Sequence, residues 1–173
     1  MNSRLLVLVT AILTAAALRL VPHPPNFTPI GAMALFSGAM LGRRLLAFAA
    51  PLAAMLLSDA LLGFHSGMPF VYASIALIVF IGWVALERRS PLRVGLAAIA
   101  GSVLFFLITN LGVWATGNMY PHDAAGLAAC YVAAIPFFQN TVAGDLFYAA
   151  VLFGGFALLE RAVPALQVEP QPA

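Results

Sequence analysis

The scarcity of charged side chains is the feature that most constrains this chain. Eight basic and six acidic residues are spread over 173 positions, which is 8% of the sequence. A soluble domain of this size carries about 25% charged residues. Hydrophobic residues make up 63% of the chain, and the mean hydropathy is +1.01. So few charges cannot cover a water-exposed surface, and the sequence therefore predicts that lipid surrounds most of the protein.

Apolar runs separated by arginine, proline or glycine predict a bundle of six transmembrane helices, an all-α membrane protein. A helix needs about 20 residues to cross the hydrocarbon core, and the second run is short for this. A further apolar stretch, 124–135, predicts a short extra helix before the last span. We expect a single membrane domain over 1–161 and, from its proline content, a disordered cytoplasmic tail over 162–173. The predicted spans are 4–21, 28–41, 45–64, 70–87, 94–114 and 137–160.

The arginines predict the orientation of the bundle. Every basic residue in the chain is arginine. Six spans put all of them but Arg19 on one side, which the positive-inside rule makes cytoplasmic. Both chain ends are then expected inside, in the inner membrane of a bacterium. An alternative is that the first span is a cleaved signal peptide, which would leave five spans. The arginines on the predicted inner side are Arg4, Arg43, Arg44, Arg88, Arg89, Arg93 and Arg161.

Polar residues gather on the predicted outer side, which holds all three histidines and all three aspartates. At 1.5 Å per residue, Asp59 lies about 8 Å and Asp145 about 12 Å inside the outer ends of their helices. A charge at mid-bilayer costs about 3 kcal/mol, so both side chains must face each other, water or a ligand. A purely structural network would be expected at both depths. The one-sided distribution therefore predicts a pocket that opens to the outside.

Two proline-containing outer loops are predicted to cover this pocket. The prolines of PHPPNF (22–27) end the first helix and hold His23 and Asn26 over the opening. The second loop is 118–123. The pair Thr28-Pro29 predicts an N-cap followed by proline at the first helical position.

The candidate ligand-binding residues have four expected roles. Aspartates and asparagines bind the ligand at depth, Arg19 fixes a carboxylate or locks one aspartate, aromatic rings provide a flat face, and the loop residues close a lid. Three aspartates against one arginine favour a cationic or zwitterionic solute. The alternative is that Arg19 only pairs with an aspartate to hold helices together. The candidates are Arg19, His23, Asn26, Asp59, His65, Asn110, Trp114, Asn118, Tyr120, His122, Tyr131, Asn140 and Asp145.

Motifs for enzyme chemistry are absent from the sequence. It contains no HExxH, GxSxG or nucleotide-binding loop and no lysine. We therefore expect no enzyme, no cofactor and no metal site, and a net charge of +2 gives no reason to expect nucleic acid. An intramembrane metalloenzyme that uses the histidines, Cys130 and the aspartates remains an alternative. Without a nucleotide-binding element, uphill transport would need energy from partner subunits.

The chain resembles a bacterial family of small integral membrane proteins that are described as candidate transport proteins without an assigned substrate. The resemblance covers about 19–148. It is carried by PHPPNFTPIGA (22–32), DALLGFH (59–65), Asn110, Tyr120-Pro121, GLAACY (126–131) and IPFFQNTVAGDL (135–146), together with Arg19.

More distantly, the layout resembles the substrate-binding S components of energy-coupling factor transporters. That resemblance implies an outward-facing pocket for a vitamin-like solute and a transmembrane coupling subunit driven by ATPases. It also implies docking through small residues on the first helix, which Ala11 and Ala15 match. Asn2 replaces the histidine that marks the cobalt and nickel branch, which argues against such a metal as substrate. We thus predict a solute-binding transporter subunit, with a membrane scaffold or assembly protein as the alternative.

Overall fold

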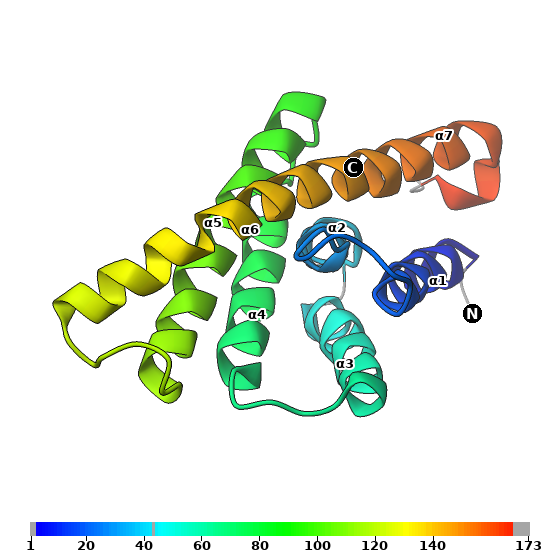
Figure 1. The fold of residues 1–173 in the computed structure, drawn as a ribbon. Helices are drawn as coiled ribbons and strands as arrows, with labels where there is room; N and C mark the ends of the chain where they lie inside the picture. The colour runs from blue at the N-terminus through cyan, green and yellow to red at the C-terminus, as the bar shows by residue number, and fades with distance from the viewer. Residues whose placement is uncertain (1–2, 43, 168–173) are drawn as a thin grey trace.

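The computed structural model describes residues 3–42 and 44–167, and over these ranges the protein is helical with no strand (Figure 1). Arg43 and residues 168–173 lie outside the described residues. After its last long helix the chain continues through a π-helical turn, η1 (Ala150–Gly154), into α7 (Gly155–Ala162), and then forms a short 3-10 helix, η2 (Pro164–Leu166). The preceding helices are α1 (Ser3–Leu18), α2 (Ile30–Met40), α3 (Arg44–Leu62), α4 (Met68–Ala85), α5 (Pro91–Thr116) and α6 (Ala124–Ala149).

Four helices are long and apolar enough to cross a membrane by length and composition. They are α3, α4, α5 and the 39-residue helix formed by Ala124–Ala162. The helices α1 and α2 are apolar but shorter, with 16 and 11 residues. Large apolar side chains cover the outside of the bundle, as shown by Leu45 at 84% exposure and Leu61 at 75%. Such a surface matches lipid, so the prediction of an all-helical, multi-pass membrane protein is confirmed.

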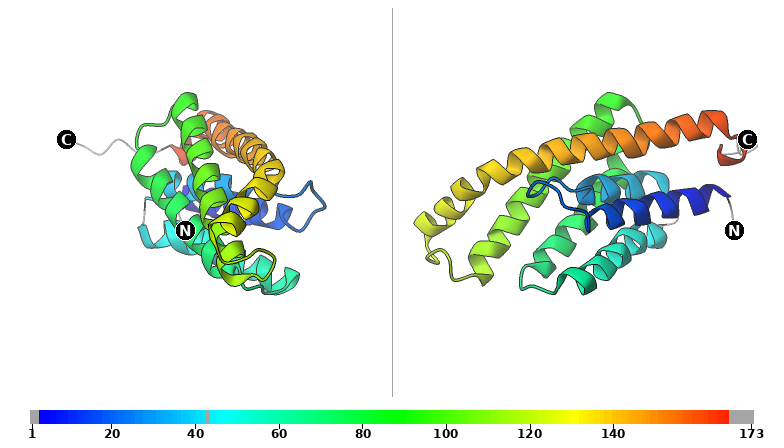
Figure 2. Two further views of the ribbon diagram at one scale, coloured as in Figure 1. Left: turned by 60° about the vertical axis from the view of Figure 1, so that its left-hand side comes forward. Right: turned by 45° about the vertical axis from the view of Figure 1, so that its right-hand side comes forward.

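The helix connections gather at two opposite ends of the bundle (Figure 2). One end holds the turns that follow α2 and α4, together with the start of α1 and the end of α7; we call it the arginine-rich end. The other end, the loop end, holds the connections α1–α2, α3–α4 and α5–α6. At the arginine-rich end Arg4 forms an ion pair with Glu160 and also donates to the carbonyl of Leu166.

The short apolar helix α2 forms the centre of the bundle. The helix α2 packs against α1, α3, α4, α5 and α6, and Met33, Leu35 and Phe36 are fully buried. Glycines allow the closest approach, since a Cβ on Gly38 of α2 would collide with the backbone of α4 at Val79. The glycine therefore lets the backbones of α2 and α4 approach closely, while the large side chains of α2 fill the space between its other neighbours.

The prediction that residues 124–135 form a separate short helix is wrong. These residues form the first part of α6, which passes through Pro136 without ending. Proline removes one helical hydrogen bond and bends a helix, but in an apolar environment this does not require the helix to stop.

The predicted tail also differs from expectation over its described part. Ala162 is the last residue of α7, and Pro164–Leu166 forms η2. Leu166 is 3% exposed, and the Gln167 side chain donates to the carbonyl of Glu160 at 3.1 Å. This part of the chain is therefore ordered at Leu166, which is buried and bonded to Arg4 of α1, while its neighbours among residues 162–167 are exposed.

The small residues of α1 face into the molecule. Ala15 is 3% exposed, and Ala11 packs against the buried core. The pair therefore contacts other helices of the same chain, and its docking of a partner subunit stays a prediction. The close helix approach that small residues permit is used within the chain, where α1 packs against α2 and α3.

Candidate functional site

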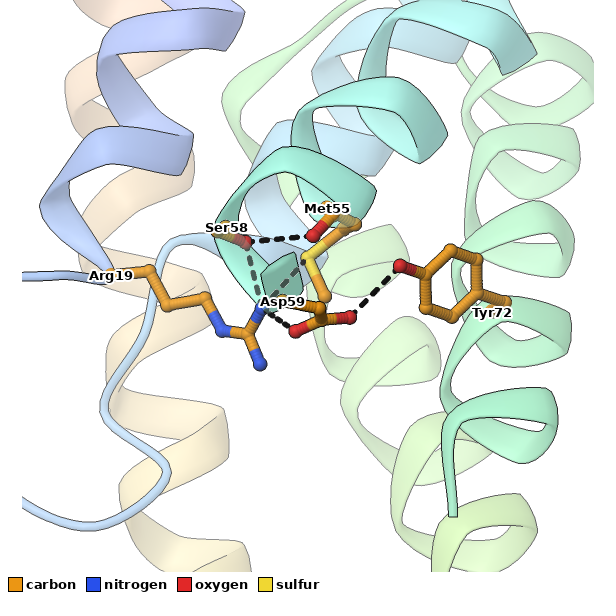
Figure 3. Close-up of polar contacts among 5 residues, drawn as sticks. All are labelled: Arg19, Met55, Ser58, Asp59 and Tyr72. Carbon is orange, nitrogen blue, oxygen red and sulfur yellow. Dashed lines mark hydrogen bonds and ion pairs between the residues drawn. The ribbon is translucent and has the colours of Figure 1, made fainter. Parts of the chain in front are cut away.

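A buried ion pair joins the first and third helices near the loop end (Figure 3). Arg19, directly after α1, pairs with Asp59 of α3. The Asp59 side chain is 1% exposed, and its second oxygen accepts a 2.8 Å hydrogen bond from the Tyr72 hydroxyl of α4. A buried carboxylate needs an opposite charge and hydrogen bonds on both oxygens, and Asp59 has both.

Arg19 makes all of its described contacts through one guanidinium nitrogen. Nη1 bonds Asp59, the Ser58 hydroxyl at 2.8 Å and the Met55 sulfur at 3.7 Å. Figure 3 shows these dashed lines converging on Nη1, while Nη2 and Nε carry none. Because guanidinium donors form a planar fork, Nη2 and Nε together match the two oxygens of a carboxylate or phosphate.

A second buried carboxylate caps the central helix. Asp145 of α6 is 3% exposed and accepts from the Ala32 amide at 3.1 Å and from the Ser102 hydroxyl at 2.6 Å. The expected cap by Thr28 is wrong: α2 begins at Ile30, its N-cap is Pro29, and no side-chain bond is made there. Instead Asp145 meets the free amides and positive dipole end of α2.

Glycine makes this long-range cap possible. A Cβ on Gly31 would overlap the Asp145 carboxylate, so the carboxylate can reach the α2 terminus only past a residue without a side chain.

A cavity of about 390 Å³ lies between these two groups. Arg19 and Asp145 both line it, which places a cation and a carboxylate on one hollow at the loop end. Two of the predicted loop residues, His23 and Asn26, also line it, together with Thr28, Ile30, Gly31, Leu62, Val71, Phe105 and Thr141. This volume is within the range of small-molecule sites.

The 19–29 connection is fixed over the cavity from α6. The Asn140 side chain donates to the Pro25 carbonyl at 2.9 Å. The Phe27 ring packs on Tyr148 with centroids 5.8 Å apart, and the backbone of Phe27 lies against Gly144. Asn140 therefore holds the loop instead of lining the cavity.

The remaining candidates lie elsewhere. Trp114 donates to the Pro121 carbonyl at 2.9 Å, and its ring packs edge-on against His122 in the α5–α6 turn. The Tyr131 hydroxyl bonds the Leu107 carbonyl at 2.7 Å, and the Asn110 amide bonds a carbonyl within its own helix. None of these residues lines the 390 Å³ cavity, and neither do His65, Asn118 or Tyr120. The structure thus brings together Arg19, Asp59, Asp145, His23 and Asn26, with Asn140 behind them.

Sequence reasoning missed Ser58, Tyr72 and Ser102, which complete the hydrogen bonding of the two charged groups. Each is a hydroxyl in a mainly apolar helix, but Ser74 and Thr109 share that signal and bond only a carbonyl of their own helix, so the pattern alone does not single out the three. Within the described ranges no three histidine, cysteine, aspartate or glutamate side chains come together as a metal ion would require.

Fold and site together define an all-helical, multi-pass membrane protein with a charged cavity at one end. Within this class, the chain belongs to the family of unknown function DUF6580, which matches residues 1–166. No curated protein and no solved structure matches the chain significantly.

Proposed function

We propose that the protein binds a small zwitterionic solute in the loop-end cavity, as the solute-binding subunit of a bacterial inner-membrane transporter. The observation that carries the proposal is the presence of Arg19 and Asp145 on one cavity of about 390 Å³. Charged groups within a membrane are costly and mark binding sites or ion pathways. The free Arg19 fork suits the anionic group of the solute, and Asp145 suits a cationic or donating group.

The proposed arrangement in the membrane has six passes, with both ends of the chain inside. The arginine-rich end then faces the cytoplasm and the cavity faces outward. Because the sequence has no nucleotide-binding loop, energy would come from partner subunits.

The first experiment is native mass spectrometry of the protein extracted gently from its own membrane. We expect one small bound mass on the wild type. Asp145→Asn should remove it, while Asn110→Ala, which alters a side chain outside the cavity, should retain it. A bare wild-type protein, or a bound mass that Asp145→Asn leaves in place, would contradict the proposal.

Arg19→Lys separates a binding role from a structural one. Lysine keeps a positive charge beside Asp59 but has one nitrogen in place of the fork. We expect unchanged folded yield and a solute affinity lower by about tenfold, the loss of one charge-assisted hydrogen bond. The measurement is a solute titration in detergent, and equal affinities would show that Arg19 only pairs with Asp59.

A membrane scaffold is the second candidate, and one observation favours it. Within the described residues no buried side-chain nitrogen or oxygen lacks a hydrogen-bond partner. A purely structural network requires this completeness. The scaffold predicts a second polypeptide, rather than a small mass, on the extracted protein.

A further inference from the structure

We propose that an anionic phospholipid binds at the arginine-rich end, with its phosphate between Arg44 and Arg89 and an acyl chain along α5 and α6. This site lies at the opposite end from the solute cavity and does not depend on the proposed function.

The headgroup cavity has a volume of about 610 Å³ and is enclosed by the end of α2, the start of α3 and the end of α4. Arg44 and Arg89 line it, and among the described residues neither has a carboxylate within ion-pair distance. The Arg44 guanidinium lies over the Trp83 ring, 4.4 Å from its centroid, and Arg89 contacts the Met40 sulfur. Among the described lining residues Glu87 is the one acidic side chain against Arg44 and Arg89, so this lining carries a net positive charge.

The chain groove is a second cavity, of about 640 Å³, between the start of α5 and the helix formed by α6, η1 and α7. Its walls are mainly apolar and include Val94, Leu146 and Phe153. Its acidic residue, Glu160, is neutralised by Arg4. The groove also runs along η1, and π-helical turns often occur at functional sites.

The two cavities adjoin, because Met40 and Arg89 line both. A cationic hollow that continues into an apolar groove matches a molecule with a phosphate at one end and hydrocarbon at the other. Basic pockets between transmembrane helices on the cytoplasmic side bind anionic lipid headgroups in this way, and tryptophan is typical of that depth. A free phosphate would fill only the first cavity.

The headgroup is tested by titrating the full-length protein, in an uncharged detergent, with palmitoyl-oleoyl phosphatidylglycerol or with the phosphatidylcholine that has the same chains. Native mass spectrometry counts the bound lipids. We expect phosphatidylglycerol to bind more tightly, and Arg44→Gln or Arg89→Gln to weaken it about fivefold, the contribution of one arginine near an anionic headgroup. Arg93→Gln is the matched control, since Arg93 is also exposed at this end but lines neither cavity.

Binding of the acyl chain in the groove is tested by substituting two adjacent glycines. A Cβ on Gly154 or on Gly155 would meet nothing within 4 Å, so a side chain can start at either position, but only Gly154 lines the groove. Gly154→Leu should lower phosphatidylglycerol affinity by roughly tenfold, equivalent to withholding two methylene groups from apolar surface. Gly155→Leu should leave it within twofold.

Three results would overturn the proposal: equal affinity for the two lipids, equal loss in Arg93→Gln and Arg89→Gln, or equal affinity in Gly154→Leu and Gly155→Leu. Displacement of the lipid by an equimolar amount of inorganic phosphate would also overturn it, because the site would then recognise phosphate without the chain. Melting temperatures of all variants, measured without added lipid, show that each is folded.

Discussion

At the scale of single residues, the two buried carboxylates are stabilised by different chemistry. Asp59 has a formal cation beside it in Arg19, whereas Asp145 has a helix N-terminus and a serine hydroxyl. The charge of Asp145 is therefore compensated by partial charges that come from backbone amides. Its position depends on the backbone of α2, which makes the residue at the point of contact sensitive to small changes.

Gly31→Ala should destabilise the protein by about 1–3 kcal/mol, the usual range for an extra methyl group forced into a packed site. The reason is that the new Cβ would overlap the Asp145 carboxylate and separate it from the Ala32 amide. Thermal unfolding in detergent measures the change. Gly42→Ala is the control, because a Cβ there would meet nothing within 4 Å. Equal melting temperatures for the two variants would show that Asp145 moves aside without loss.

At the scale of helices, a proline in one element is compensated by a serine in another. Pro51 lies inside α3 and has no N–H, so the carbonyl of Ala47 lacks its helical partner. The hydroxyl of Ser37, on α2, donates to that carbonyl at 2.7 Å. Ser37 is fully buried, so this bond forms away from water and fixes α3 against the central helix.

Ser37→Ala should lower the free energy of unfolding by about 1 kcal/mol, because the Ala47 carbonyl then has no partner. In a Pro51→Ala background the cost should nearly vanish, since the restored N–H of residue 51 can bond that carbonyl. A double-mutant cycle measured by chemical unfolding in detergent gives the coupling. If Ser37→Ala lowers the free energy of unfolding by the same amount in both backgrounds, the hydrogen bond from Ser37 does not compensate for the proline.

Sequence patterns predicted the helices better than they predicted which side chains meet. The positions of α3, α4 and α5 agree closely with the expected spans, because length and apolarity determine them. Helices that are apolar all round, however, have no stripe that fixes their rotation in the bundle. Asn110 and Trp114 are predicted to share a ligand pocket with Asp145, but their side chains bond within α5 or to the α5–α6 turn.

The capping of α2 shows the same limit over a longer distance. A local pattern indicated Thr28, yet the group that accepts the Ala32 amide is 113 residues away along the chain. The sequence indicates that Arg19 can pair with an aspartate, and the structure shows that this aspartate is Asp59. The role of the assembled cavity in binding stays a prediction.

At the scale of the whole molecule, the two ends of the bundle should lie on opposite sides of a membrane. Single cysteines introduced in a Cys130→Ser background test this. Asn118→Cys lies at the loop end and Glu87→Cys at the arginine-rich end, and both positions are exposed. We expect an impermeant maleimide to label position 118 on intact cells, and position 87 only after the membrane is opened. Labelling of both positions from one side would rule out the six-pass arrangement.

The clasp formed by Arg4 with Glu160 and Leu166 has a consequence for how the protein is made. Arg4, in the first helix, receives these two partners from residues that lie 156 and 162 positions further along the chain. Asp145 likewise reaches the α2 amides only when α6 arrives, whereas Asp59 is available to Arg19 much earlier. A nascent chain that stops before α6 therefore has Arg19 at the cavity but not Asp145. In such a chain Arg4 also lacks its contacts with Glu160 and Leu166. Translation of α6, α7 and η2 is thus required before both the cavity and the contacts of Arg4 can form.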